Sequence, residues 1–151
     1  MALDDDIRIL SGVRLFEGFT QDQLRLLAFG AETTRLQQDR KLYREDDDAD
    51  SAYVVVKGRI SLYREADGER VEVGSVGPGA MLGELALIAE TRRLTSAAAE
   101  TDAEVLRLNR AMFRRIIEEY PETAEALHRR ISEDLQALIR RIEELAPRFA
   151  G

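Results

Sequence analysis

The chain has 151 residues, about one domain, and its net charge of −7 with an isoelectric point near 4.9 argues against nucleic-acid binding, which needs a basic face. It has no cysteine, which excludes disulfides, thiolate metal sites and thiol catalysis. The first residues are acidic where a secretion signal needs positive charge, and no apolar run approaches membrane-spanning length, so we expect a cytoplasmic protein that does not bind membranes.

The N-terminal segment, residues 1–32, is predicted to be helical. Residues 15–19 form an apolar anchor closed by a turn glycine. Thr20 and Gln23 then have the spacing of a capping box, and a helical stripe of apolar residues begins at Leu24.

Residues 33–108 change to short apolar runs separated by turn formers, a pattern typical of an antiparallel sandwich or barrel. Asp67-Gly68 between two alternating runs indicates a hairpin. A short helix is expected to interrupt the strands at residues 84–89. The predicted strand runs are 41–43, 52–56, 60–63, 71–73 and 104–108.

Two helices are predicted in residues 109–147. Asn109 is a candidate N-cap for a helix to about Tyr120, and Pro121 suits the first position of a long last helix. Pro147 ends that helix just after Ala146. The order is therefore helix, strands and two helices, with no second domain and no repeat.

Apolar residues on the last helix are spaced 4, 3, 4 and 3, the pattern of a coiled-coil seam. The stripe can pack against the strands of its own chain or against a second copy. Intervening charges favour self-association as a homodimer. The seam residues are Ile131, Leu135, Leu138, Ile142 and Leu145.

The most informative stretch is residues 79–95, where a glycine turn leads into a very short helix. Free amides at the start of a helix favour an anion, and Gly83 lets the backbone approach a ligand closely. The Glu84 carboxylate can accept hydrogen bonds from a sugar hydroxyl. Arg93, about two turns later, can neutralise a phosphate.

The run Leu-Gly-Glu-Leu-Ala-Leu at 82–87, with Arg93 nine residues after Glu84, resembles the phosphate-binding cassette of cyclic-nucleotide-binding domains. That family includes catabolite activator protein and the regulatory subunits of cyclic-AMP-dependent kinase. Segments 15–19, 51–60 and 77–79 also resemble family motifs. The resemblance implies an α+β fold, an antiparallel β-roll or jelly-roll barrel flanked by N-terminal helices and a long C-terminal helix.

The resemblance also implies a role for each residue of the cassette. Glu84 would bind the ribose 2′-hydroxyl, and Arg93 an exocyclic oxygen of the cyclic phosphate. The backbone amides of Leu85 and Ala86 would complete the phosphate cradle. The other ligand-binding positions of the cassette would be Gly83, Leu94 and Thr95.

In the same resemblance the last helix covers the base as a lid. The catabolite activator branch has hydroxyl residues there, but Leu138 and Ile139 occupy the two places, so the lid presses on the base without reading its edge.

Several positions depart from the family pattern. Glu90 and Arg92 replace a glycine and a proline, and Leu94 replaces a small residue, with Thr95 one place late. Asp46 replaces a glycine, which predicts strain in that turn.

Other interpretations stay open for single residues. Glu84 alone could simply cap the short helix, and Arg93 could pair with Glu90 or Glu100 at the surface. Arg92 is then the second candidate for the phosphate.

The sequence gives little support for a metal site or for catalysis. Asp46, Asp48 and Asp50 alternate as in a calcium loop but lack its glycine and closing glutamate, so a solvated acidic turn is expected. His128 is the single histidine, and no nucleophile, metal or acid–base pair can be assembled around it. We therefore expect no enzyme activity, no metal and no cofactor.

The leading hypothesis is a regulatory sensor that binds a cyclic nucleotide monophosphate, with cyclic AMP favoured over cyclic GMP, and signals to an unknown effector protein. A second is a degenerate domain that serves dimerisation or interaction without a ligand. A third is a fragment of a larger regulator, such as a transcription factor.

Overall fold

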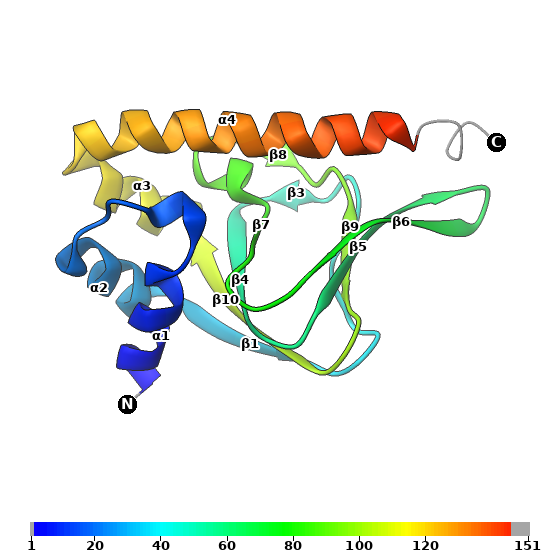
Figure 1. Ribbon diagram of the computed structural model, residues 1–151, viewed down its shortest axis with the longest axis horizontal. Coiled ribbons are helices and arrows are strands. Elements are labelled where there is room, and N and C mark those ends of the chain that lie inside the picture. The colour runs from blue at the N-terminus through cyan, green and yellow to red at the C-terminus, as the bar shows by residue number, and fades with distance from the viewer. Residues whose placement is uncertain (1, 146–151) are drawn as a thin grey trace.

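The structure, a computed structural model, describes residues 2–145. Helical segments flank a body of antiparallel strands, and a long C-terminal helix crosses its top (Figure 1). The predicted end of this helix at Ala146 and Pro147 lies outside the described residues. The helical segments are α1 (Ala2–Ser11), the 3-10 turn η1 (Arg14–Phe16), α2 (Gln21–Gly30), the 3-10 turn η2 (Glu84–Leu87), α3 (Arg110–Glu118) and α4 (Pro121–Glu144).

The strands form two four-stranded sheets, ordered β1-β10-β4-β7 and β2-β9-β5-β6, and a two-stranded sheet, β3-β8. Every pairing is antiparallel, so the predicted β-roll with flanking helices is confirmed, although the sheets do not close into a complete barrel. The strands are β1 (Glu32–Leu36), β2 (Lys41–Tyr43), β3 (Asp48–Ala49), β4 (Ser51–Lys57), β5 (Ile60–Ala66), β6 (Glu69–Val76), β7 (Met81–Leu82), β8 (Thr91–Arg92), β9 (Ser96–Ala99) and β10 (Ala103–Asn109).

The predicted turns form where the sequence indicates. Gly58 joins β4 to β5 with φ +81°, and a Cβ there would lie 2.2 Å from the Asp102 carbonyl oxygen. Asp67 and Gly68, both at positive φ, join β5 to β6. Asp46 has φ +70°, so the turn in which it replaces a glycine is strained as expected.

The predicted helix starts are also confirmed. Thr20 and Gln23 exchange the two hydrogen bonds of a capping box at α2. The Asn109 side chain accepts hydrogen bonds from two amides in the first turn of α3. Pro121 is the first residue of α4, where its missing N–H costs nothing.

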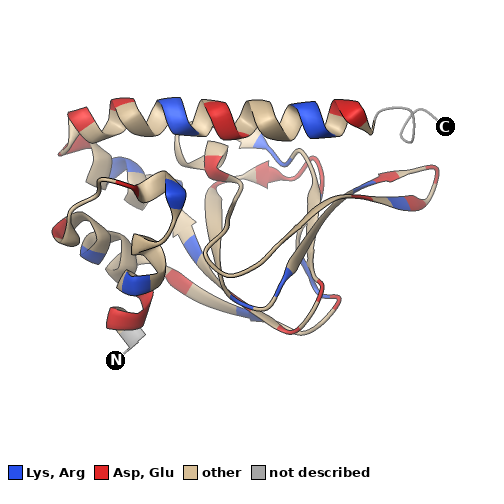
Figure 2. Ribbon diagram, in the orientation of Figure 1, with Lys and Arg blue, Asp and Glu red and all other residues tan. Residues whose placement is uncertain are grey.

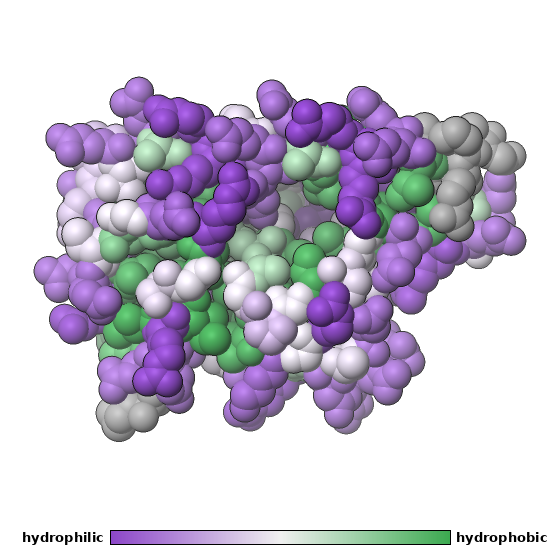
Figure 3. Space-filling model, viewed as in Figure 1, coloured by the Kyte–Doolittle hydropathy of each residue, from purple (hydrophilic) through white to green (hydrophobic). Residues whose placement is uncertain are grey.

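The core has two parts, one between the helices and β4 and β10, and one between the sheets. α4 packs on η1 and η2, and Ile131 on its inner face is fully buried. Acidic and basic residues alternate along α4 (Figure 2), and hydrophobic residues show beneath its largely hydrophilic outer face (Figure 3). Within residues 2–145 no helix is long and apolar enough to cross a membrane.

Candidate functional site

A pocket of about 170 Å³ lies between η2, the neighbouring strands and the inner face of α4. The structure brings every cassette residue predicted to bind a ligand to this pocket. These residues are Gly83, Glu84, Leu85, Ala86, Arg93, Leu94 and Thr95. Arg92, the second candidate for the phosphate, also lines the pocket but is exposed and lies 3.8 Å from Asp48.

Arg93 is a buried cation, only 6% exposed. Its Nη2 donates a hydrogen bond of 2.8 Å to the Ser51 carbonyl oxygen, while Nε and Nη1 are buried without a partner. Among the described residues it makes no ion pair, and Glu100 pairs instead with Arg59. A buried guanidinium with two free donors is costly unless an anion completes its shell.

Two aromatic rings, and not a carboxylate, lie beside this guanidinium. Arg93 Cζ lies 4.3 Å from the centre of the Tyr43 ring and 5.6 Å from that of Tyr53. The face of an aromatic ring attracts a cation but leaves its N–H groups free. The positive charge therefore stays available to a ligand.

Two features require a glycine at position 83: its backbone conformation and the closeness of Arg93. Gly83 has φ +70°, and a Cβ on it would lie 2.2 Å from Arg93 Nη1. The sequence predicted a close approach of the backbone to a ligand at this position. In the structure the group that approaches is the guanidinium that would hold the ligand.

The short helix predicted at residues 84–89 is a single 3-10 turn, η2, which changes the expected phosphate cradle. The amide of Ala86 donates to the Gly83 carbonyl oxygen at 3.0 Å, so it is already engaged. Among the described residues, the amide of Leu85 has no hydrogen-bond acceptor. Of the two predicted cradle amides, only that of Leu85 is free.

Glu84 is mostly buried at the start of η2. Burial raises its pKa from 4.5 to about 7; the hydrogen bond from its own amide opposes this shift, the charge of Asp134 adds to it, and the charge of Arg14 opposes it. Asp134 lies on α4 and forms an ion pair with Arg14 of η1, which also pairs with Glu133. The pocket is thus bounded by one buried cation and two carboxyl groups.

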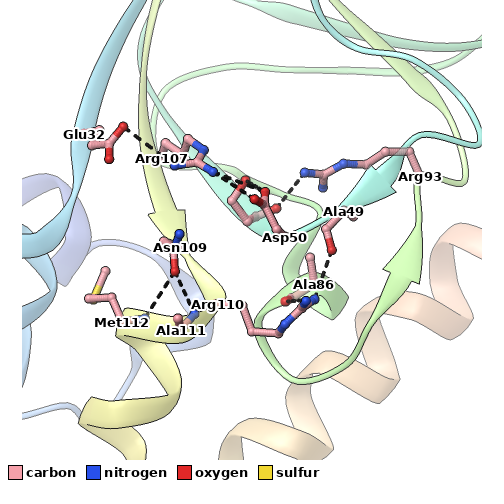
Figure 4. A network of polar contacts seen from close by, with 11 residues as sticks. Glu32, Ala49, Asp50, Ala86, Arg93, Arg107, Asn109, Arg110, Ala111 and Met112 are labelled. Atoms are coloured by element: carbon pink, nitrogen blue, oxygen red, sulfur yellow. Dashed lines mark hydrogen bonds and ion pairs between the residues drawn. The ribbon is translucent and has the colours of Figure 1, made fainter.

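A network of acidic and basic side chains surrounds the start of β4, where the Ser51 carbonyl binds Arg93 (Figure 4). Asp50 accepts hydrogen bonds from Ser51 Oγ at 3.0 Å and from Arg107 Nη2 at 3.2 Å. Arg107 also pairs with Glu32. These acids serve ion pairs, and within residues 2–145 no three histidine or acidic side chains gather as a metal site.

The predicted seam of α4 faces its own chain over most of its length. Ile131 is buried, Leu135 and Leu138 line the pocket, and the last two seam residues, Ile142 and Leu145, are partly exposed.

The two residues predicted to contact the base from the lid lie on different faces of α4. Leu138 lines the pocket, whereas Ile139 lies on the outer face, 39% exposed, because neighbouring helix positions point about 100° apart. Contrary to the prediction, Ile139 does not line the pocket that would hold the base.

Three contributors to the site were missed at the sequence level: Tyr43, Tyr53 and Asp134. They come from β2, β4 and α4, which are far apart in the sequence and meet only in the folded chain. The residue types carry no local motif that could have identified them.

The family model described as "Cyclic nucleotide-binding domain" matches residues 33–120. A cyclic nucleotide-binding-like protein from Brucella abortus is 58% identical over 76% of this chain and 99% of that chain, with a TM-score of 0.70. The regulatory domain of Toxoplasma gondii PKA, solved with cAMP, is 28% identical over 76% of this chain and 44% of that chain, with a TM-score of 0.71. Neuropathy target esterase sws of Drosophila grimshawi is 36% identical over 87 residues, 57% of this chain and 6% of that protein. The chain therefore spans only a small part of the esterase.

Proposed function

The chain belongs to the cyclic nucleotide-binding domain family, and from that premise we propose that it binds a cyclic nucleotide monophosphate in the pocket beneath α4. Its role in this proposal is that of a regulatory sensor and not of an enzyme. The observation that carries the proposal is Arg93, a buried guanidinium with two unpaired nitrogens beside Gly83. A singly charged cyclic phosphate supplies the acceptors that these nitrogens lack.

We further assign contacts within the pocket. Arg93 binds an exocyclic phosphate oxygen, Glu84 accepts a hydrogen bond from the ribose 2′-hydroxyl, and Leu138 covers the base. We propose cyclic AMP over cyclic GMP; the related Toxoplasma gondii domain was solved with cAMP. A cytoplasmic location and an effector protein that reads the pose of α4 belong to the same proposal.

The small volume of the pocket is the argument that α4 acts as a lid and opens to admit the ligand. The pocket's volume of about 170 Å³ is small beside the roughly 300–1,000 Å³ of pockets that hold drug-sized ligands. α4 forms its outer wall through Leu135 and Leu138. Binding of a nucleotide therefore requires α4 to move outward, which gives the sensor its signal.

We also propose that the chain forms a homodimer through α4. Ile142 and Leu145 continue the apolar stripe beyond the pocket and are partly exposed, so they remain available to a second copy.

A second candidate function is a domain that associates without a ligand. Leu94 favours it, because this residue is 38% exposed at the pocket where the family pattern has a small side chain. Such a domain would keep the fold and the dimer but leave Arg93 unpaired.

A thermal-shift panel separates the two functions. The purified chain is melted with cyclic AMP, cyclic GMP, 5′-AMP and a cyclic dinucleotide, each at millimolar concentration. A ligand at 100 times its Kd stabilises the folded state by about 2.7 kcal/mol, which gives a clear rise in Tm. A rise with a cyclic mononucleotide alone supports the sensor, and no rise with any of them supports the ligand-free domain.

A further inference from the structure

Arg110, the first residue of α3, binds backbone from two separate parts of the strand region (Figure 4). Its Nη1 lies 3.0 Å from the Ala49 carbonyl oxygen of β3. The same nitrogen lies 2.9 Å from the Ala89 carbonyl oxygen and 3.3 Å from that of Ala86. The amide of Arg110 also donates to the Asp50 carbonyl oxygen at 2.8 Å. One residue thus joins α3, β3 and the segment that contains η2.

The charge of Arg110 is directed at carbonyl groups and not at an acid. Within residues 2–145 it makes no ion pair. The Ala86 carbonyl lies within η2 and the Ala89 carbonyl lies two residues after its end, so Arg110 contacts both the turn and the segment that follows it. All three carbonyl oxygens lie around one half-buried nitrogen, Nη1, and share its two N–H groups.

Arg110 and Arg93 hold opposite ends of the same short segment. Arg93 lies against Gly83, just before η2, and Arg110 holds the end of η2 and the residues after it. α3 packs on η2 and is followed directly by α4. Arg110 is therefore a direct polar link between η2 and the start of α3.

From this geometry we propose that Arg110 is a positioning residue: it holds η2 in the conformation that binds the ligand and ties the position of η2 to that of α3 and α4. This inference rests on the proposed function, because the ligand is the cyclic nucleotide assigned above.

The test uses a fluorescent probe on α4. Since the chain has no cysteine, Ala137→Cys on the exposed face of α4 gives one labelling site for an environment-sensitive dye. Cyclic AMP and cyclic GMP are titrated into the labelled protein and into its Arg110→Met, Arg110→Lys and Arg114→Met variants. Arg114, exposed on the same helix, is the matched control.

We expect Arg110→Met to weaken binding by about 2- to 30-fold and to reduce the fluorescence change at saturating nucleotide. Arg110→Lys keeps the charge on a side chain one bond shorter and should restore part of the response, while Arg114→Met should behave as the parent. A purely structural role would lower the Tm and leave the saturated amplitude unchanged.

Hydrogen exchange of the unliganded variants gives a readout independent of the ligand. Arg110→Met should speed exchange in residues 84–89 while β10 stays protected. Full affinity, full amplitude and unchanged exchange in Arg110→Met would overturn the inference and leave the proposed function standing. If the parent binds neither nucleotide, both the proposed function and the inference fail.

Discussion

The guanidinium carbon of Arg93 lies 4.3 Å from the centre of the Tyr43 ring, and the ring of Tyr53 stacks on Tyr43 at 6.0 Å between centres. Burial raises the pKa of Tyr43 to about 12, so its phenol is neutral and cannot act as a counter-ion. The rings orient the guanidinium, and its charge is left for a bound phosphate.

Tyr43→Leu should therefore weaken cyclic nucleotide binding. A cation–π contact contributes about 0.5 to 2 kcal/mol, so we expect a roughly 2- to 30-fold loss of affinity by calorimetry. Tyr43→Phe keeps the ring and should stay within about twofold of the wild type. Equal losses in the two variants would mean that the ring does not position Arg93.

Arg93→Met should separate binding from stability. It removes the charged hydrogen bonds to the phosphate, so affinity should fall by about 10- to 150-fold. It also removes a buried unpaired charge, so the Tm of the unliganded protein should hold or rise. Arg92→Met, at an exposed residue, is the control and should change neither by much. A large fall in Tm with unchanged affinity would make Arg93 a structural residue.

The order of elements and the cassette were predictable because their signals are local. Turn glycines, two helix caps and the six-residue run at 82–87 each act within a few residues of sequence, and the structure has them in place.

The surroundings of Arg93 were not predictable from the sequence, because they depend on strand pairing. Tyr43 reaches the pocket through the pairing of β2 with β9, and Tyr53 is placed opposite Leu82 by the pairing of β4 with β7. The stripe on α4 was ambiguous for another reason: an inner helix face and a coiled-coil seam have nearly the same period. Ile131 and Leu138 contact the chain's own core and pocket, whereas Ile142 and Leu145 at the end of the stripe are partly exposed.

Gly83→Ala should disrupt the site from the backbone side. A left-handed conformation costs a non-glycine residue about 1 to 2 kcal/mol, and the new Cβ would also displace the guanidinium of Arg93. We expect a lower Tm and a loss of affinity of about tenfold or more. Gly79→Ala is the matched control, since Gly79 has φ +90° with no atom within 4 Å of its Cβ position. It should lower the Tm while affinity is retained; equal losses of affinity would show that strain alone is responsible.

The raised pKa of Glu84 predicts an unusual pH dependence of stability. The folded protein holds the Glu84 proton up to about pH 7, whereas the unfolded chain releases it near pH 4.5. The stability contributed by the neutral carboxyl is fully present below pH 4.5 and is lost as the pH rises to about 7, by on the order of 3 kcal/mol. Urea unfolding between pH 4.5 and 8 should show this fall in the wild type and a flatter profile in Glu84→Gln. Glu90→Gln, at an exposed residue of the following loop, should keep the wild-type slope, and identical profiles for all three proteins would contradict the assignment.

Along the apolar stripe of α4, different residues are expected to make the lid contact and the dimer contact. Single substitutions should therefore affect one without the other. Leu138 lines the pocket, whereas Ile142 lies past it and is partly exposed. Ile142→Asp should therefore convert a dimer to a monomer in sedimentation velocity and leave nucleotide affinity within about twofold, because a charge cannot be buried cheaply between two helices. Leu138→Ala should change affinity and keep the dimer, and Ile139→Asp, on the outer face, should change neither. If the wild type already sediments as a monomer, α4 is a lid for its own chain alone, since its stripe is then satisfied by contacts within one molecule.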